Sequence, residues 1–249
     1  MQSHKERIWQ RFQQAKPTYA QSAKIQRTMQ RTLLTLLQKH CPMQKFTNIL
    51  ELGCGNGILS QQFAQIFEFE SYLAVDLVDF SQDFAAISYP IDFLQADFED
   101  LTQIEKINPA LKYDLILSNA AIQWVHQPSF LPRLSGLLKP KGFLAFSTFG
   151  KANYQELRAI FGIGLEYLDL KDYARILGRE FEILESFAMK TPLHFHNTLA
   201  LFKHLRNTGV NSLQLGFKLN KTHLKDYATR FHNVLTYHPL YIIAQKRES

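Results

Sequence analysis

Three glycines at alternate positions in a short loop are the first feature of the sequence with chemical meaning. The loop reads Glu51-Leu52-Gly53-Cys54-Gly55-Asn56-Gly57, a pattern of the form ExGxGxG. Glycines let the backbone turn tightly and approach a ligand without a Cβ in the way. The helix expected after the loop would present free N–H groups at its amino terminus, and these favour a carboxylate. The loop therefore predicts a binding site for a small ligand.

The spacing of the glycines distinguishes this loop from two other glycine-rich loops. It does not fit the GxGxxG of dinucleotide-binding folds, and no GK[ST] follows as in a phosphate-binding loop. The two cysteines, Cys41 and Cys54, form neither a CxxC pair nor a disulfide framework. We therefore expect two reduced thiols and no metal site.

Apolar strand-like and helix-like segments alternate along the chain and must position the loop. Strands are expected at residues 46–52, 72–75, 91–95, 113–117, 142–148, 181–187 and 235–246, and helices at 21–40, 58–67, 101–107, 129–138, 154–160 and 170–177. A regular order of this kind predicts an α/β fold with a parallel sheet covered on both faces.

The outer segments predict how this fold is organised as a domain. We expect one domain over residues 1–249, with a helical N-terminal extension at 1–42. The polar and aromatic stretch at about 190–232 is expected to be a helical lid insertion. Such a lid would cap the carboxyl edge of the sheet, where open α/β sheets bind ligands.

Composition and charge limit the class of protein. With 46% hydrophobic and 20% charged residues the chain has enough apolar residues for a sizeable core. Its apolar runs are too short to cross a bilayer and its first residues lack a signal peptide's apolar segment, so we expect a cytoplasmic protein without a membrane partner. The net charge of +6 favours an acidic partner and leaves open nucleic acid, an anionic small molecule and an acidic carrier protein.

The glycine loop and the stretches behind it resemble, in order, the motifs of class I S-adenosylmethionine-dependent methyltransferases. The matching stretches are FLQADFED, YDLILSNAAIQW and the turn LKPKG, in which Lys141-Gly142 replaces the commoner double glycine. The resemblance implies a Rossmann-like, mostly parallel seven-stranded sheet. It also implies S-adenosylmethionine as cofactor and S-adenosylhomocysteine as product.

The resemblance implies a role for each residue of the cofactor site. Asp76 would bind the ribose hydroxyls, with Asp79 as the rival candidate, and Asp97 would bind the adenine amine while Phe98 stacks on the ring. Asp114 is expected to order its strand and not to touch the cofactor. The predicted cofactor-binding residues are Glu51, Gly53, Gly55, Gly57, Asp76, Asp97, Phe98 and Asn119.

Beyond this core, the chain resembles the malonyl carrier-protein O-methyltransferases of biotin synthesis over nearly its full length. The stretches that carry the resemblance are RFQQAKPTYAQSAKIQ, SNAAIQWV, FSTFGKANYQELR and LFKHLRNTGVNSL. The segment LQLGFKLNKTHLKDY departs from the family because it is shorter and has only Gly216. The resemblance implies methyl transfer to the carboxylate of a malonyl thioester on acyl carrier protein.

This reaction needs no general base, because a malonyl carboxylate is already an anion near neutral pH. Arg206 is our candidate for gripping that carboxylate, since guanidinium offers a planar fork of donors. His126 and Lys203 are the alternatives. Tyr19 and Trp124 are expected to be pocket walls over the transferred methyl.

Three other functions compete with this interpretation. A methyltransferase for a small free carboxylic acid, similar to the trans-aconitate enzymes, would share the fold and the lack of a base. Methylation of nucleic acid is not expected, because the chain has Ser118-Asn119-Ala120-Ala121 in place of the Asn/Asp-Pro-Pro-aromatic motif. A non-catalytic domain that merely binds S-adenosylmethionine or a partner is the third alternative, and the presence of Asp76 and Asp97 argues against it.

Overall fold

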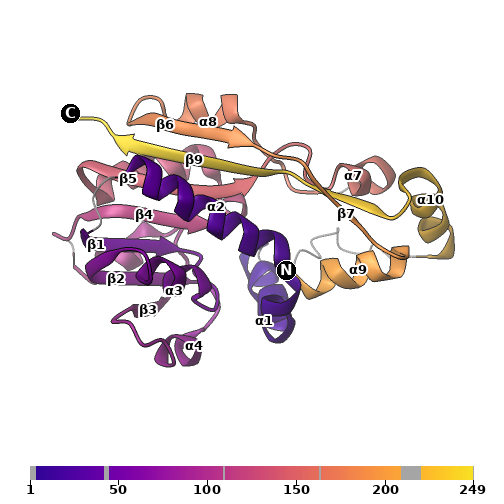
Figure 1. Ribbon diagram of the computed structural model, residues 1–249, viewed down its shortest axis with the longest axis horizontal. Coiled ribbons are helices and arrows are strands. Elements are labelled where there is room, and N and C mark those ends of the chain that lie inside the picture. The colour runs from indigo at the N-terminus through magenta and orange to yellow at the C-terminus, as the bar shows by residue number, and fades with distance from the viewer. Residues whose placement is uncertain (1–3, 42–44, 109, 163, 209–219, 249) are drawn as a thin grey trace. The chain divides into compact units, whose positions relative to one another are not determined.

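The computed structural model describes residues 4–41, 45–108, 110–162, 164–208 and 220–248, with backbone alone for residues 4 and 19–21 (Figure 1). These residues fall into two compact units. We call the first the core unit, which comprises Gln26–Thr148, Asp169–Ala188 and Leu240–Ser249. We call the second the accessory unit, which comprises Met1–Ile25, Phe149–Leu168 and Met189–Pro239.

The core unit is built on a seven-stranded sheet with the strand order β3-β2-β1-β4-β5-β9-β6. β1 pairs in parallel with β2 and β4, as do β2 with β3 and β4 with β5, whereas β6 and β9 are antiparallel. The strands are β1 (Lys45–Leu52), β2 (Glu68–Asp76), β3 (Asp92–Gln95), β4 (Tyr113–Asn119), β5 (Leu138–Phe149), β6 (Phe181–Ala188) and β9 (Pro239–Lys246). The helices are α2 (Lys24–His40), α3 (Ile58–Ala64), α4 (Ser81–Ala85), α5 (Leu101–Glu105), α6 (Gln127–Phe130) and α8 (Leu170–Leu177), with the 3₁₀ turns η1 (Ile122–Trp124) and η2 (Leu131–Leu137).

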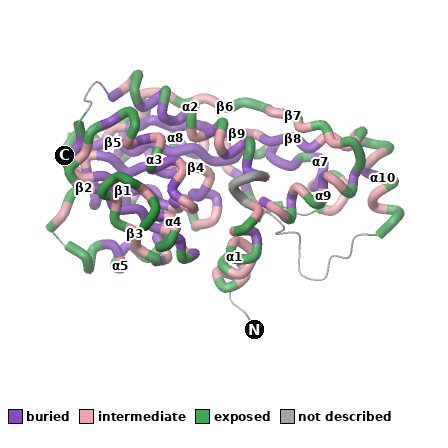
Figure 2. The backbone as a smooth tube through the Cα atoms, turned by 60° about the horizontal axis from the view of Figure 1, so that its bottom comes forward, coloured by how far each residue is buried: buried purple, intermediate pink, exposed green. Residues whose placement is uncertain are grey.

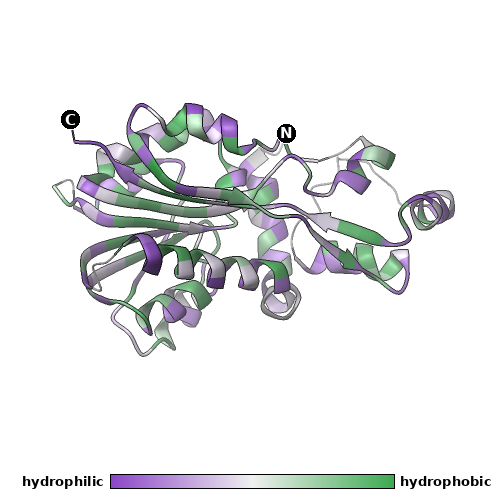
Figure 3. Ribbon diagram, turned by 45° about the horizontal axis from the view of Figure 1, so that its top comes forward, coloured by the Kyte–Doolittle hydropathy of each residue, from purple (hydrophilic) through white to green (hydrophobic). Residues whose placement is uncertain are grey.

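Continuous apolar runs form the central strands because helices lie on both sides of this sheet (Figure 3). Leu115, Ile116 and Leu117 of β4 are fully buried, and so are Ile49, Leu50 and Leu52 of β1. Figure 2 shows the same burial along the strands. The mostly parallel sheet and the α/β class predicted from the sequence are confirmed.

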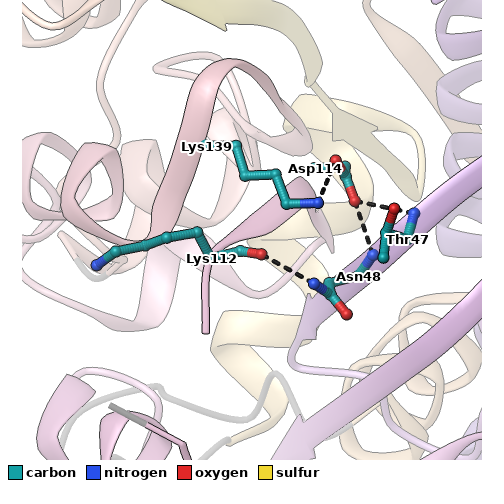
Figure 4. Close-up of polar contacts among 5 residues, drawn as sticks. All are labelled: Thr47, Asn48, Lys112, Asp114 and Lys139. Atoms are coloured by element: carbon teal, nitrogen blue, oxygen red, sulfur yellow. Dashed lines mark hydrogen bonds and ion pairs between the residues drawn. The ribbon is translucent and has the colours of Figure 1, made fainter. Parts of the chain in front are cut away.

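Asp114 fastens the start of β4 to β1. Its Oδ2 accepts hydrogen bonds from the backbone N–H groups of Thr47 (2.9 Å) and Asn48 (2.7 Å), and its Oδ1 lies 2.8 Å from Lys139 Nζ (Figure 4). These contacts lie at the amino end of β1, whereas the glycine loop follows its carboxyl end. The prediction that Asp114 orders its strand is confirmed.

The described residues of the accessory unit form four helices and a two-stranded antiparallel ladder. Its helices are α1 (His4–Ser22), α7 (Gln155–Phe161), α9 (Thr198–Asn207) and α10 (Lys221–Phe231), and its strands are β7 (Thr191–His194) and β8 (Val234–Tyr237). Tyr227 and Tyr237 are fully buried, and Tyr227 Oη donates to the carbonyl of Val234 (2.6 Å). The buried Glu156 accepts hydrogen bonds from the backbone N–H (3.0 Å) and the hydroxyl of Thr236, so its carboxylate ties α7 to β8.

Three predicted elements differ from the structure. Residues 129–138 form mainly the 3₁₀ turn η2, because Pro132 lacks an N–H donor and Gly136 disfavours an α-helix. Residues 235–246 form two strands in different sheets, with the break at His238-Pro239, where proline again removes a donor. The stretch expected to be helical, 190–232, also contains the strand β7.

A membrane-spanning segment was not expected. Among the helices of the described residues, none is both long enough and apolar enough to cross a bilayer.

Candidate functional site

The glycine loop joins the end of β1 to α3 with all three glycines in the left-handed region. Their φ angles are +74° at Gly53, +53° at Gly55 and +75° at Gly57, a conformation that L side chains rarely adopt. The N–H groups of Gly53 and Cys54 both donate to the carbonyl of Val75, at 2.8 and 3.2 Å. The loop is therefore fastened to the end of β2.

Close packing also leaves no room for a Cβ at Gly53 and little room for one at Gly57. A Cβ on Gly53 would lie only 2.2 Å from the Cβ of Ala121, and a Cβ on Gly57 would lie 2.7 Å from Ile87 Cδ1. A Cβ on Gly55 would meet nothing within 4 Å. The loop is thus packed on its protein side and has open space at Gly55, as a loop that cradles a ligand requires.

Asp76 closes the other side of the loop. Its Oδ2 accepts a hydrogen bond from Gly55 N–H and its Oδ1 accepts one from Val78 N–H, each at 2.9 Å. Burial raises the pKa of Asp76 to about 6, and the backbone N–H groups partly offset this by lowering it. A carboxylate oxygen has more than one lone pair, so both oxygens can still accept from a ligand's hydroxyl groups.

Asp79, the other candidate for binding the ribose, makes a hydrogen bond to its own loop. It is exposed, and its Oδ1 accepts from the backbone N–H of Ser81 (2.8 Å) at the start of α4. The geometry therefore favours Asp76, which touches the glycine loop directly.

Glu51 lies beneath the loop and is fully buried. Its Oε2 accepts hydrogen bonds from Ser60 Oγ (2.5 Å) on α3 and from Tyr72 Oη (2.6 Å) on β2. Burial, which outweighs these two hydrogen bonds, raises the pKa of Glu51 to about 7. Through these contacts Glu51 joins β1, β2 and α3, so it supports the loop from below. A contact of Glu51 with the cofactor itself stays a prediction.

Burial, followed by the negative charges of Asp76 and Glu51, raises the pKa of the Cys54 thiol above its usual range. Its burial is that of a packing residue of the loop.

The loops after β3 and β4 meet beside the glycine loop. Phe98 is buried, its ring is 5.7 Å from that of Phe130, and its Cε1 would lie 3.6 Å from a Cβ on Gly53. The neighbouring Glu99 accepts the backbone N–H of His126 (2.8 Å). Asp97 is half-buried and its Oδ1 accepts from the N–H of Glu99 (3.1 Å).

Asn119 ends β4 at this same edge of the sheet. Its Oδ1 accepts from Ser147 Oγ (2.6 Å) and its Nδ2 donates to the backbone carbonyl of Gln26 (3.3 Å). The predicted cofactor residues at the ends of four strands, β1 to β4, are therefore brought together at the carboxyl edge, where open α/β sheets bind ligands.

The structure describes only some of the side chains predicted to position the methyl acceptor. Trp124 lies in η1, half-buried, in the core unit. Arg206 lies on α9 in the accessory unit and is exposed, and the side chain of Tyr19 lies outside the described residues. His126 is exposed, and its Nδ1 lies 2.7 Å from Ser129 Oγ at the start of α6. The roles of these side chains stay predictions.

Sequence reasoning missed Gln26, although it is the last residue of the quoted stretch RFQQAKPTYAQSAKIQ. Its side chain is only 4% exposed, and its Oε1 has no hydrogen-bond partner within the described part of the chain. A buried acceptor without a donor is costly, so this atom fits a ligand that brings a donor. The pattern could have drawn attention to Gln26, but its burial could only be seen in the fold.

The comparison with known proteins agrees with this geometry. A family described as "Methyltransferase domain" matches residues 21–208 of the chain. A malonyl-[acyl-carrier protein] O-methyltransferase of Calditerrivibrio nitroreducens is 33% identical over 244 residues, which cover 95% of each chain. The chain belongs to this family of methyltransferases. A second member, from Haemophilus influenzae, is 35% identical over 97% of this chain and 94% of its own.

Solved structures show the same fold at low sequence identity. The YcgJ protein of Bacillus subtilis superimposes with a TM-score of 0.60 over 88% of this chain and 100% of its own, at 12% identity. A 1,6-didemethyltoxoflavin N1-methyltransferase of Burkholderia thailandensis, solved with S-adenosylhomocysteine, gives a TM-score of 0.54 at 17% identity over 93% of this chain and 85% of its own. These likenesses confirm the class I methyltransferase fold.

We predict that Asp76→Ala weakens the binding of S-adenosylmethionine and of S-adenosylhomocysteine by a similar factor. The ribose is common to both ligands, and each lost hydrogen bond to a charged acceptor costs about 1.5–3 kcal/mol. Isothermal titration calorimetry with both ligands measures the effect. Asp79→Ala is the matched control and should keep the affinity of the unaltered protein. If Asp79→Ala weakened the binding of both ligands and Asp76→Ala did not, Asp79 would be the carboxylate that binds the ribose.

We also predict that Glu51→Gln alters how stability depends on pH. The pKa of Glu51 is raised from 4.5 to about 7 in the fold, so the unaltered protein loses stability as pH rises through this interval. The loss that belongs to Glu51 amounts to about 3 kcal/mol between pH 4 and 8. The glutamine variant cannot ionise, and its free energy of unfolding in urea should rise relative to that of the unaltered protein over this range. Parallel stability curves would show that Glu51 does not titrate in this way.

Proposed function

We propose that this enzyme transfers a methyl group from S-adenosylmethionine to the free carboxylate of a malonyl thioester on acyl carrier protein, an early cytoplasmic step of biotin synthesis. The observation that carries the proposal is the near-full-length similarity to malonyl-[acyl-carrier protein] O-methyltransferases, which includes the accessory unit as well as the methyltransferase core. A match confined to the core would support only a methyltransferase of unspecified substrate.

The cofactor would be held at the carboxyl edge of the core unit. S-adenosylmethionine supplies an electrophilic methyl group when bound. Asp76 would accept hydrogen bonds from the ribose hydroxyls, Asp97 would accept one from the adenine amine, and Asn119 would face the methionine portion. Phe98, next to Gly53, would pack against the adenine ring. The open space at Gly55 lets the ligand approach the backbone closely.

The acceptor needs orientation more than activation. A malonyl carboxylate is ionised near neutral pH and is itself the nucleophile, so no side chain has to remove a proton. What the protein must supply is a grip on the carboxylate that points one oxygen at the methyl group. Arg206, with Trp124 and Tyr19 as walls of the pocket, is our candidate set for this task, and the stretch 190–232 would act as the lid.

Dependence on the carrier tests the proposed function. Transfer of a labelled methyl group should be fast with malonyl carrier protein, slower with a small malonyl thioester and slowest with trans-aconitate. A preference for trans-aconitate or free malonate would indicate a methyltransferase for small carboxylic acids. Binding of S-adenosylmethionine without transfer to any acceptor would indicate a non-catalytic domain.

We predict that Arg206→Lys is nearly as damaging as Arg206→Ala. Lysine keeps the positive charge but loses the planar fork that holds a carboxylate through two parallel hydrogen bonds. Turnover with malonyl carrier protein should fall strongly in both variants, while calorimetry shows unchanged affinity for S-adenosylmethionine. A lysine variant that keeps most of its activity would make Arg206 a surface charge, with His126 and Lys203 as the next candidates.

A further inference from the structure

The net positive charge of the protein comes entirely from the accessory unit. This unit has 14 Lys and Arg against 4 Asp and Glu, a net charge of +10. The core unit has 14 Lys and Arg against 18 Asp and Glu, a net charge of −4, and together they give the +6 of the chain. A protein that merely needed a basic surface for solubility would have no reason to separate its charges in this way.

The helices α9 and α10 carry much of this charge on exposed positions. Lys221 and Lys225 are one turn apart on α10, and Lys203 and Arg206 lie on α9. All four side chains are exposed, and none of them makes an ion pair within the described residues. The two helices pack on each other through Phe202 and Tyr227, whose ring centroids are 6.2 Å apart.

An apolar residue lies among these cations. Leu199 is 61% exposed, and with Lys203 it follows the spacing i, i+4, which places the two on one face of α9. Protein-binding surfaces combine complementary charge with apolar contacts, and Leu199 offers one such contact beside these cations.

We propose that the exposed faces of α9 and α10 form the docking surface for the acidic carrier protein. This inference rests on the proposed function, because it names where the partner of that reaction binds. The lysines would attract the acidic surface of the carrier from a distance, and Leu199 would add an apolar contact once it has docked.

Charge reversal on α10 tests this surface. The variant is Lys221→Glu with Lys225→Glu, and the matched control is Lys106→Glu with Lys171→Glu, two exposed lysines of the core unit. Both double variants change the net charge equally. Glutamate at the start of a helix is favoured by the helix dipole, so Lys221→Glu is compatible with α10. Thermal unfolding verifies that both variants fold.

We expect the α10 variant to lower kcat/KM for malonyl carrier protein about ten-fold or more at low salt, through a higher KM. Its dependence on salt should flatten, because the attraction that salt screens has been removed. Transfer to a small malonyl thioester should stay within about two-fold, and the control should keep both activities.

Several outcomes would overturn the docking surface. Equal losses in both double variants would mean that net charge matters and its location does not. An unchanged KM in the α10 variant would place the docking surface elsewhere. If that variant instead loses only its affinity for a duplex oligonucleotide, measured in parallel, these helices bind a different polyanion. If the unaltered enzyme does not methylate malonyl carrier protein at all, the proposed function fails and this inference with it.

Gln26 carries a second inference on independent grounds. Its backbone carbonyl accepts from Asn119 Nδ2, which places it beside the carboxyl end of β4. Its buried Oε1 has no donor among the described residues, and Asn119 Oδ1 is already engaged by Ser147. The backbone of Gln26 therefore lies at the end of the site predicted to face the methionine portion of the cofactor, and its side chain carries an acceptor without a donor.

We infer that Gln26 Oε1 accepts a hydrogen bond from the α-ammonium group of S-adenosylmethionine. An ammonium has three donors and no acceptor, so it requires oxygens such as this one. The hydrogen bond would also satisfy an amide oxygen that the fold buries without a partner.

Calorimetry with two ligands isolates this contact. Gln26→Leu removes the acceptor at similar size, and Gln26→Glu keeps an acceptor. We expect Gln26→Leu to weaken S-adenosylhomocysteine about ten-fold or more and to leave 5′-methylthioadenosine, which lacks the ammonium group, within about two-fold. Gln26→Glu should retain the affinity for S-adenosylhomocysteine. Equal weakening of both ligands by Gln26→Leu, or no weakening, would show that Gln26 does not bind the ammonium.

Discussion

The hydrogen bond from Gly55 N–H to the carboxylate of Asp76 is the interaction on which the site depends. It joins the end of β1 to the end of β2 at 2.9 Å and holds the loop in a left-handed conformation that glycine tolerates. Glu51 supports the same loop from below through Ser60 and Tyr72. A fully buried carboxylate, Glu51, and a half-buried one, Asp76, therefore shape a loop that has open space at Gly55.

Removing these carboxylates from water lowers the stability of the folded protein. Both have a raised pKa, so each makes the protein less stable at neutral pH than a neutral side chain of equal fit would. In return, the loop and the hydrogen-bond acceptor Asp76 are already in position before the ligand binds. Placing acceptors in advance lowers the conformational entropy that binding must overcome.

Much of the core fold could be predicted from the sequence because its signals are local. The apolar runs of β1 and β4, the glycine spacing and the acids at strand ends each mark a position directly, and the sheet edge then brings Asp76, Phe98 and Asn119 together. The break between β8 and β9 was missed because an apolar run shows where a strand can form but not which sheet it joins. The 3₁₀ turn at η2 was missed because its apolar spacing is also that of an α-helix.

The residues that would bind the methyl acceptor could be predicted only in part. Arg206 was chosen for its chemistry and lies on an exposed face of α9, which no local pattern reveals. Gln26 was overlooked because its burial, its unpaired side-chain oxygen and its backbone contact with Asn119, 93 residues away in the chain, are visible only in the fold. The separation of charge likewise required the two units to be known, because the basic residues of the accessory unit are spread over three segments.

Mass spectrometry of acyl carrier proteins tests the central claim most directly. Malonyl, succinyl and glutaryl carrier proteins, with unacylated carrier as the control, are incubated with the enzyme and S-adenosylmethionine. The account predicts that the malonyl carrier gains the mass of one methylene group, located on the acyl group. A malonyl carrier that gains no mass, or an equal gain on the unacylated control, would contradict it.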